Sequence, residues 1–169
     1  MRGFLTITAA ALLTTPAQAN QPPPESDAVV AAADAFFEAL RNPDKTALSK
    51  ELLNEAVIFV HDRRDPENPR TMIVPAGQHL EGWLTSAPGV DEYMSYDSVL
   101  VDGTMAHVWG PYTFLVNGKT THCGVNSMSM VKTEDGWKVG NTSFTMVSPE
   151  DCETVGASRI QLIPEQPGE

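Results

Sequence analysis

The stretch TMAHVWGPYTFLVNGKTTHCGVNSMSMVK, residues 104–132, decides the fold of this chain. Two long runs rich in aliphatic and aromatic residues flank Asn117-Gly118, and Asn-Gly between such runs is the strongest short signal for a β-hairpin. Turn sequences also stand at residues 102–103 and 133–136. The three turns predict four long antiparallel strands in a meander, formed by residues 91–101, 104–116, 119–132 and 137–147.

Two helices are expected before the meander. Apolar residues recur at helical spacing over residues 29–40. Ser26 or Asp27 is expected to cap the helix that they form, because both side chains accept hydrogen bonds from free backbone N–H groups. A short second helix is expected over residues 45–53.

A hairpin and a third helix follow. The runs AVIFVHD (residues 56–62) and TMIV (residues 71–74) predict the hairpin. Pro75 suits the first turn of a helix that extends to Ala87 and whose buried side is expected to carry Leu80, Trp83 and Leu84. These elements together predict an α+β domain, in which a curved antiparallel sheet wraps around the N-terminal helices and forms a cone with a cavity.

The first 19 residues have the pattern of a secretory signal peptide. Arg2 precedes an apolar run, and Ala17-Gln18-Ala19 supplies the small residues of a cleavage site. We expect cleavage after Ala19 and a periplasmic or secreted protein. The rest of the chain is expected to divide into a proline-rich linker, one domain and a polar C-terminal tail with weak structure, at residues 20–25, 26–147 and 148–169.

The chain is strongly acidic, with 22 acidic and 11 basic side chains and a formal net charge of −11. Removal of residues 1–19 takes away Arg2 and no acid, so 10 basic side chains remain and the net charge becomes −12. Nucleic-acid binding and adsorption to an anionic membrane both need a basic surface. We therefore expect neither nucleic acid nor a membrane as a partner.

Cys123 and Cys152 are the two cysteines of the chain. In an oxidising compartment an isolated pair indicates a disulfide. A metal site built on them would need at least two further ligands, and the four histidines show no suitable cluster. The sequence thus predicts a disulfide, no metal site and no cofactor.

Three stretches carry a family resemblance: FFEALRNPDKTALSKELL (residues 36–53), VWGPYTFLVNGKTTHCGVNSM (108–128) and GWKV (136–139). With the predicted order of elements, they resemble the nuclear transport factor 2-like superfamily, which includes ketosteroid isomerases, scytalone dehydratases and polyketide cyclases. They look most like an exported bacterial branch labelled lumazine-binding. The resemblance covers residues 27–147 and implies the cone fold. It also implies a homodimer through the outer face of the sheet.

Alternation along residues 122–131 indicates which side chains enter the cavity. His122, Asn126 and two methionines share one face, while two serines interrupt the other, which favours the methionine face as the interior. Gly124 would then leave an opening for a ligand between His122 and Asn126. Cys123 would face away, towards the tail that carries Cys152.

The resemblance to the isomerases implies roles for three residues. Asn126 stands at the position of the oxyanion-hole aspartic acid, and its amide can donate a hydrogen bond to an oxyanion. His61 or Asp62 stands near the position of the general base, and His61 is favoured because its pKa is near neutrality. The tyrosine of the isomerases' first helix has no counterpart in this chain.

The same residues also have structural interpretations. A His122 bonded to Asn126 would be a satisfied polar pair within a sheet. Tyr112 and Phe114 follow a Gly-Pro dipeptide at residues 110–111, which suggests a β-bulge. The two aromatic residues would serve as core packing or as the wall of a site for a flat ligand.

Three functions fit these observations. The first is an exported domain that binds a small apolar or cyclic molecule, oriented by Trp83, Tyr112, Phe114, His122 and Asn126. The second is a cofactor-independent isomerase, dehydratase or cyclase, with His61 or Asp62 as base and Asn126 as oxyanion donor. The third is a purely structural homodimer.

Overall fold

The computed structural model describes residues 24–86, 88–160 and 162. The expected signal peptide at residues 1–19 and most of the expected linker lie outside the described residues. No helix within the described part of the chain is both long and apolar enough to cross a bilayer.

The described residues form an α+β fold in which helices accompany a single seven-stranded sheet. The helices are α1 (Glu25–Arg41), η1 (Lys45–Ala47), α2 (Leu48–Glu51), α3 (Ala76–Leu84) and η2 (Pro149–Val155), of which η1 and η2 are 3-10 helices. The strands are β1 (Val57–Asp62), β2 (Arg70–Pro75), β3 (Val90–Met94), β4 (Ser98–Asp102), β5 (Met105–Val116), β6 (Lys119–Thr133) and β7 (Gly136–Met146).

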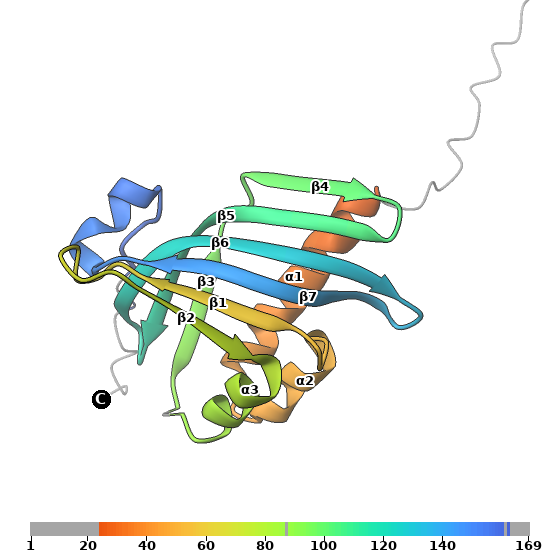
Figure 1. Ribbon diagram of the computed structural model, residues 1–169, viewed down its shortest axis with the longest axis horizontal. Helices are drawn as coiled ribbons and strands as arrows, with labels where there is room; N and C mark the ends of the chain where they lie inside the picture. The colour runs from red at the N-terminus through yellow and green to blue at the C-terminus, as the bar shows by residue number, and fades with distance from the viewer. Residues whose placement is uncertain (1–23, 87, 161, 163–169) are drawn as a thin grey trace, which may run out of the picture.

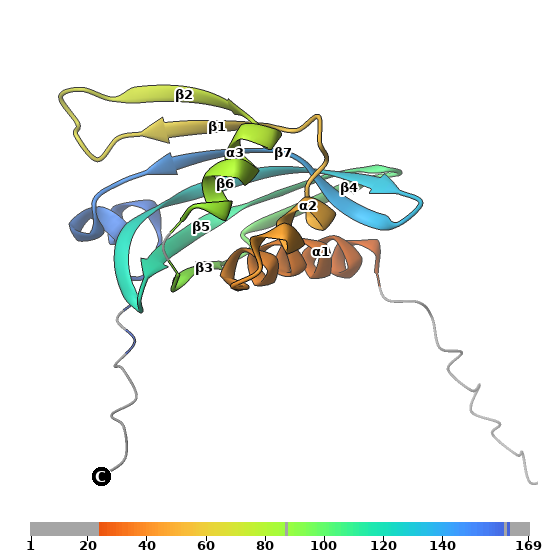
Figure 2. The ribbon, with the colours of Figure 1, turned by 90° about the horizontal axis from the view of Figure 1, so that it is seen from below.

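The sheet runs in the order β2-β1-β7-β6-β5-β3, and β4 also pairs with β5. Every pairing is antiparallel except β1 with β7, which is parallel. Figures 1 and 2 show the strands curving and α1, α2 and α3 gathered on one side of them. The predicted cone of a curved sheet around N-terminal helices is therefore confirmed, with one parallel pair added.

The hairpin predicted at Asn117-Gly118 is present between β5 and β6. Asn117 has φ 50° and Gly118 has φ 72°, the left-handed backbone that two-residue hairpin turns require and that Asn-Gly adopts most easily. The strands expected at residues 104–116, 119–132 and 137–147 correspond to β5, β6 and β7.

The strand expected at residues 91–101 is divided into β3 and β4, both paired with β5. Three residues, 95–97, lie opposite the two residues Gly110 and Pro111, so the irregularity predicted at this dipeptide is on the facing strand. Gly110 is needed here because a Cβ would lie 1.7 Å from the carbonyl oxygen of Ser95. In a close-packed sheet this backbone carbonyl cannot move far enough to make room for a side chain at Gly110.

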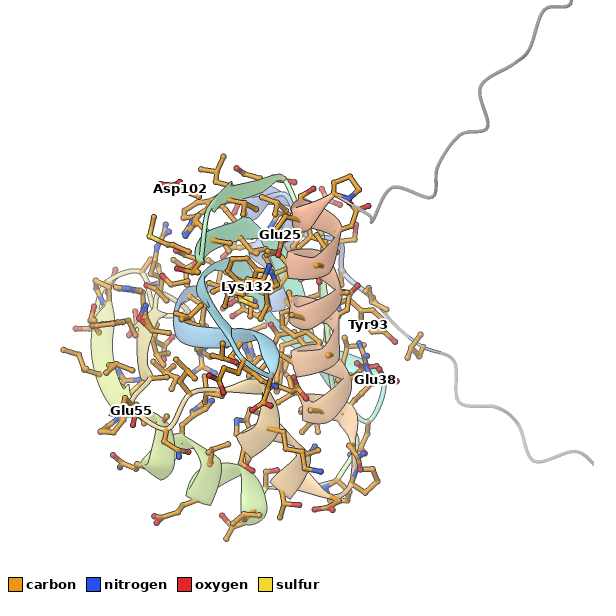
Figure 3. All side chains as sticks on the ribbon, turned by 90° about the vertical axis from the view of Figure 1, so that its right-hand side faces the viewer. Glu25, Glu38, Glu55, Tyr93, Asp102 and Lys132 are labelled. Atoms are coloured by element: carbon orange, nitrogen blue, oxygen red, sulfur yellow. A yellow bond between two sulfur atoms is a disulfide. The ribbon has the colours of Figure 1, made fainter. Side chains whose placement is uncertain are left out.

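The helix boundaries differ from expectation in detail. The N-cap of α1 is Pro24, without a side-chain cap, so the caps expected from Ser26 or Asp27 are not formed. The carboxylate of Glu25 instead accepts from the indole of Trp137 at 2.8 Å and pairs with Lys132, which points towards it in Figure 3. These contacts tie the start of α1 to β6 and β7.

The second and third helices are shorter than predicted. The stretch 45–53 is divided between η1 and α2, which ends at Glu51. Helix α3 starts at Ala76, and Pro75 is its N-cap. Leu80 and Trp83 pack against the core as expected, but Leu84 is 60% exposed, so its predicted burial is wrong.

The described part of the C-terminal tail is structured, which corrects the expectation of weak structure. Cys152 of η2 is disulfide-bonded to Cys123 of β6, at a sequence separation of 29, so the predicted pair is confirmed. Farther along, Thr113 donates a hydrogen bond of 2.6 Å to the carbonyl oxygen of Ser158. The tail thus packs on the side of β5 and β6 away from α1.

Candidate functional site

A cavity of about 150 Å³ lies between the concave face of the sheet and the helices. Helices α1 and α3 contribute its floor, and β1, β3, β5, β6 and β7 contribute its walls. Most of the lining is aromatic or aliphatic: Phe36, Phe37, Leu40, Ile58, Trp83, Tyr112, Phe114, Met128, Phe144 and Met146. The polar lining consists of His79, Glu92, His122, Asn126 and Thr142.

Tyr112 and Gly124 close one part of the concave face. The Tyr112 hydroxyl donates a 2.8 Å hydrogen bond to the carbonyl oxygen of Thr145. A Cβ on Gly124 would lie 1.8 Å from that same oxygen and 2.8 Å from the Tyr112 ring. The opening expected at Gly124 is therefore absent, because the missing side chain makes room for the tyrosine and not for a ligand.

His122 lines the cavity as a stacked, uncharged ring. Its ring lies 4.6 Å from that of Phe114 at an interplanar angle of 21°. Its Nδ1 is 3.2 Å from the hydroxyl of Thr121. Burial, assisted by repulsion from Arg64, lowers the pKa of His122 to about 4. His122 is therefore neutral at physiological pH.

Asn126 bonds to Glu92 and not to His122. Its Nδ2 donates a 2.7 Å hydrogen bond to Oε1 of Glu92, across from β6 to β3. Burial raises the pKa of the Glu92 carboxyl to about 7, although the hydrogen bond from Asn126 acts in the opposite direction. The polar pair considered from the sequence, His122 with Asn126, is therefore not formed. Asn126 pairs instead with Glu92, whose carboxyl titrates near neutrality.

Sequence reasoning missed Glu92. Two adjacent acids, Asp91 and Glu92, at the start of a strand are typical of a solvated strand end, and this pattern hides a half-buried carboxyl that lines the cavity. The register supplies the missing signal: Glu92 pairs with Phe114, so the two side chains lie on the same face. Because Phe114 faces the cavity, its pairing partner Glu92 faces the cavity as well.

Helix α3 contributes Trp83 and a histidine that the sequence did not single out. Trp83 Nε1 donates a 2.9 Å hydrogen bond to His79 Nε2, one helical turn away. The Trp83 ring lies 6.1 Å from the Phe114 ring. Burial lowers the pKa of His79, and its Nε2 is an acceptor for Trp83, so His79 is neutral as well.

The two residues expected as general base do not line the cavity. His61 lies within hydrogen-bonding distance of Ser143 (3.0 Å) and Thr71 (3.3 Å) on the outer face of the sheet. Asp62 is buried but accepts two side-chain hydrogen bonds from Arg64, at 2.9 and 2.8 Å. These bonds lower the pKa of Asp62 to about 2, which makes it a weak base.

The structure thus brings Trp83, Tyr112, Phe114, His122 and Asn126 together around one cavity and leaves His61 and Asp62 outside it. Within residues 24–86, 88–160 and 162, no group of three or more metal-ligating side chains is close enough to hold a metal ion. This lining can surround an apolar ring and offer it one polar pair, the Asn126 amide with the Glu92 carboxyl.

No protein-family model and no curated protein matches this sequence. Solved structures do match the fold. A candidate dehydratase of the nuclear transport factor 2-like family from Streptomyces avermitilis has a TM-score of 0.59 at 20% identity, over 73% of this chain and 96% of that one.

Two further structures agree. A candidate aromatic ring hydroxylase from Novosphingobium aromaticivorans has a TM-score of 0.57 at 15% identity, over 77% of this chain and 94% of that one. A nuclear transport factor 2-like protein of unknown function from Silicibacter pomeroyi has a TM-score of 0.57 at 14% identity, over 71% of this chain and 93% of that one. The chain has the nuclear transport factor 2-like fold.

Proposed function

We propose that this protein is an exported domain that binds a small cyclic molecule in the cavity. The aromatic lining of a partly open cavity of about 150 Å³ carries the proposal. Apolar cavities of about that volume hold a single aromatic ring in other proteins. Ligand sites are typically apolar pockets with a few converging polar groups, and this cavity has that composition.

The polar lining supports binding in one orientation. Asn126 and Glu92 form a bonded pair at 2.7 Å, and the neutral His122 lies on the same strand as Asn126. A ligand with one polar substituent would direct it towards these groups and leave its ring against Phe114 and Trp83. The binding residues expected from the sequence therefore keep their proposed role, with Glu92 added.

Native mass spectrometry of protein purified from its own host tests this proposal. We expect the wild-type protein to carry a small molecule. Thr142→Leu adds bulk to the cavity wall and should abolish that added mass. Ser143→Leu adds more bulk on the neighbouring residue, which faces the outer side of the sheet near His61, and should retain it. A ligand retained by Thr142→Leu, or lost equally from both variants, would contradict binding in this cavity.

Export is proposed from the N-terminal signal pattern and the disulfide between Cys123 and Cys152. The chain-entropy estimate for a bridge spanning 29 positions is about 3–4 kcal/mol of stability. Protein recovered from the periplasm should start at Asn20 and show no free thiol when titrated under denaturing conditions. Two free thiols would contradict this localisation.

A second candidate function is cofactor-independent proton transfer, as in an isomerase, dehydratase or cyclase. The observation in its favour is a carboxyl with a pKa of about 7 beside an amide donor in an apolar cavity. Glu92 would replace His61 and Asp62 as the base, and Asn126 would donate to the developing oxyanion. An assay of cyclic enones and ketones tests it. Wild-type turnover that is lost in both Glu92→Gln and Asn126→Asp would support proton transfer. A wild type that turns over none of these compounds would contradict it.

We also propose a homodimer through the outer face of the sheet. On that face β4 and β5 expose Leu100 (63%), Met105 (63%) and Trp109 (46%). Burying such residues between two copies would remove apolar area from water. Sedimentation should show a dimer that Trp109→Ser weakens. A monomer at all accessible concentrations would contradict it.

A further inference from the structure

The described lining of the cavity combines six aromatic rings with one carboxyl group and no lysine or arginine. The rings are those of Phe36, Phe37, Trp83, Tyr112, Phe114 and Phe144, and Glu92 is the one acid in the lining. No lysine or arginine of the described chain lines this cavity, and the ammonium of Lys45 lies 5.9 Å from the centroid of the Trp83 ring. Aromatic faces carry negative electrostatic potential, so rings and carboxylate together make the cavity attractive to a cation.

One oxygen of the Glu92 carboxyl is available to a ligand. Oε1 accepts the hydrogen bond from Asn126 Nδ2. Within the described residues no protein group bonds to Oε2, and no buried polar side-chain atom among them is without a hydrogen-bond partner. Oε2 is therefore not sealed by protein atoms, and Glu92 lines the cavity.

Arg41 of α1 does not neutralise this carboxylate. Its guanidinium donates to the backbone carbonyl oxygen of Glu92 at 3.1 Å and to the carboxylate of Asp91 at 2.7 Å. It is thus committed to the outer side of β3. The negative charge of Asp91 raises the pKa of Glu92 further, and the positive charge of Arg41 lowers it by a smaller amount.

The remaining titratable groups around Glu92 are uncharged. His79 of α3 and His122 of β6 are neutral because burial lowers the pKa of each. Tyr112 of β5 and Tyr96, between β3 and β4, have raised pKa values and stay protonated. An ionised carboxylate in such surroundings is costly unless a cation arrives with the ligand.

We propose that the ligand is a monocyclic amine, whose ring fills the aromatic part of the cavity and whose ammonium group pairs with Glu92. This inference rests on the proposed binding function and specifies the charge of the ligand. The ammonium would donate to Oε2, while the Asn126 amide holds Oε1 and fixes the plane of the carboxylate. The strongly acidic chain, with a formal net charge of −11, also favours the approach of a cation.

Benzylamine and benzyl alcohol form a matched pair of probes, since they differ in the amine or hydroxyl carried by the same ring and carbon. Calorimetry on the wild-type protein near pH 8 should show benzylamine binding at least about tenfold tighter, as expected for a charge-assisted bond. Because burial raises the pKa of the Glu92 carboxyl to about 7, benzylamine affinity should also increase as the pH rises through that value.

Glu92→Gln keeps the shape and removes the charge, so it should reduce benzylamine affinity about tenfold or more and leave benzyl alcohol binding nearly unchanged. Equal affinity of the two probes for the wild type, or tighter binding of the alcohol, would overturn the amine inference while supporting a ring-binding cavity. Failure of both probes to bind would overturn the binding function itself. If Glu92→Gln does not fold, the amine inference is still tested on the wild-type protein, by the comparison of benzylamine with benzyl alcohol and by the pH dependence of benzylamine affinity.

Discussion

The concave face of the sheet has a packed half and a hollow half. In the packed half, Leu48, Val108, Met130 and Val139 are at most 1% exposed and fill the space under α1 and α2. In the hollow half, large rings such as Phe114 and Trp83 stand around a cavity that also contains Glu92. The comparison teaches that a carboxyl is tolerated inside this fold where the rings leave a space that a ligand can fill.

The largest expected effect contrasts the same substitution in the two halves. Leu48→Ala should cost about 3–5 kcal/mol of unfolding free energy, because a fully packed leucine loses all its contacts and leaves a new void. Leu40→Ala should cost about 2 kcal/mol, since this buried leucine lines the cavity and the volume that it vacates joins an existing hollow. Urea denaturation of the two variants measures the difference. Equal losses would contradict the division into halves.

Gly124 tests the boundary between the halves. Gly124→Ala should cost about 3 kcal/mol, the upper part of the usual range for overpacking, because its Cβ would lie 1.8 Å from a backbone oxygen. The control is Gly77→Ala in α3, where no atom lies within 4 Å of the added Cβ, and where alanine should stabilise the helix by about 0.5–1 kcal/mol. Thermal melts compare them. If the Gly124→Ala protein were as stable as wild type, the space beside Gly124 would be open, as the sequence predicted, and the packed arrangement would be wrong.

The sequence predicts the packed half better than the hollow half. The turns at residues 102–103, 117–118 and 133–136 set the register of β5, β6 and β7, and alternation along β6 then places Asn126 inside correctly. Such local signals depend on near neighbours in the chain. They are sufficient for the meander and the hairpin of β1 and β2, and the disulfide partner of Cys123 follows because the chain has only two cysteines.

The contents of the hollow half depend on contacts between distant elements. Gly124 alone looks like an opening, and only the position of Tyr112 and of the Thr145 carbonyl shows that it is filled. Glu92 looks like a solvated acid until its pairing with Phe114 is known. His61 was placed by family resemblance, but the pleat of β1 directs it to the outer face.

The last expected effect, and the smallest within any one pH unit, is a pH dependence that belongs to the hollow half. The pKa of Glu92 is raised from 4.5 to about 7, so between these values the folded protein keeps a proton that the unfolded chain has lost. Its contribution to stability therefore falls as the pH rises through this window, by at most about 1.4 kcal/mol per pH unit. In Glu92→Gln this fall should be absent.

The low pKa of His122, about 4, acts in the opposite direction: the stability that it contributes is lost as the pH falls from 6.5 towards 4. Since His122 is present in both proteins, the difference between wild type and Glu92→Gln isolates the carboxyl. Urea denaturation at several pH values between about 4 and 8 measures this difference. A difference that does not change with pH would mean that Glu92 is solvated.

A crystal structure of the wild-type protein soaked with iodobenzene tests most directly whether the hollow half admits a ring. The iodine is located by its anomalous scattering. We predict an iodine site inside the cavity, with the ring against Phe114 and Trp83 and no site in the packed half around Leu48 and Met130. Iodine found only on the molecular surface, with the cavity walls closed on one another, would contradict the account.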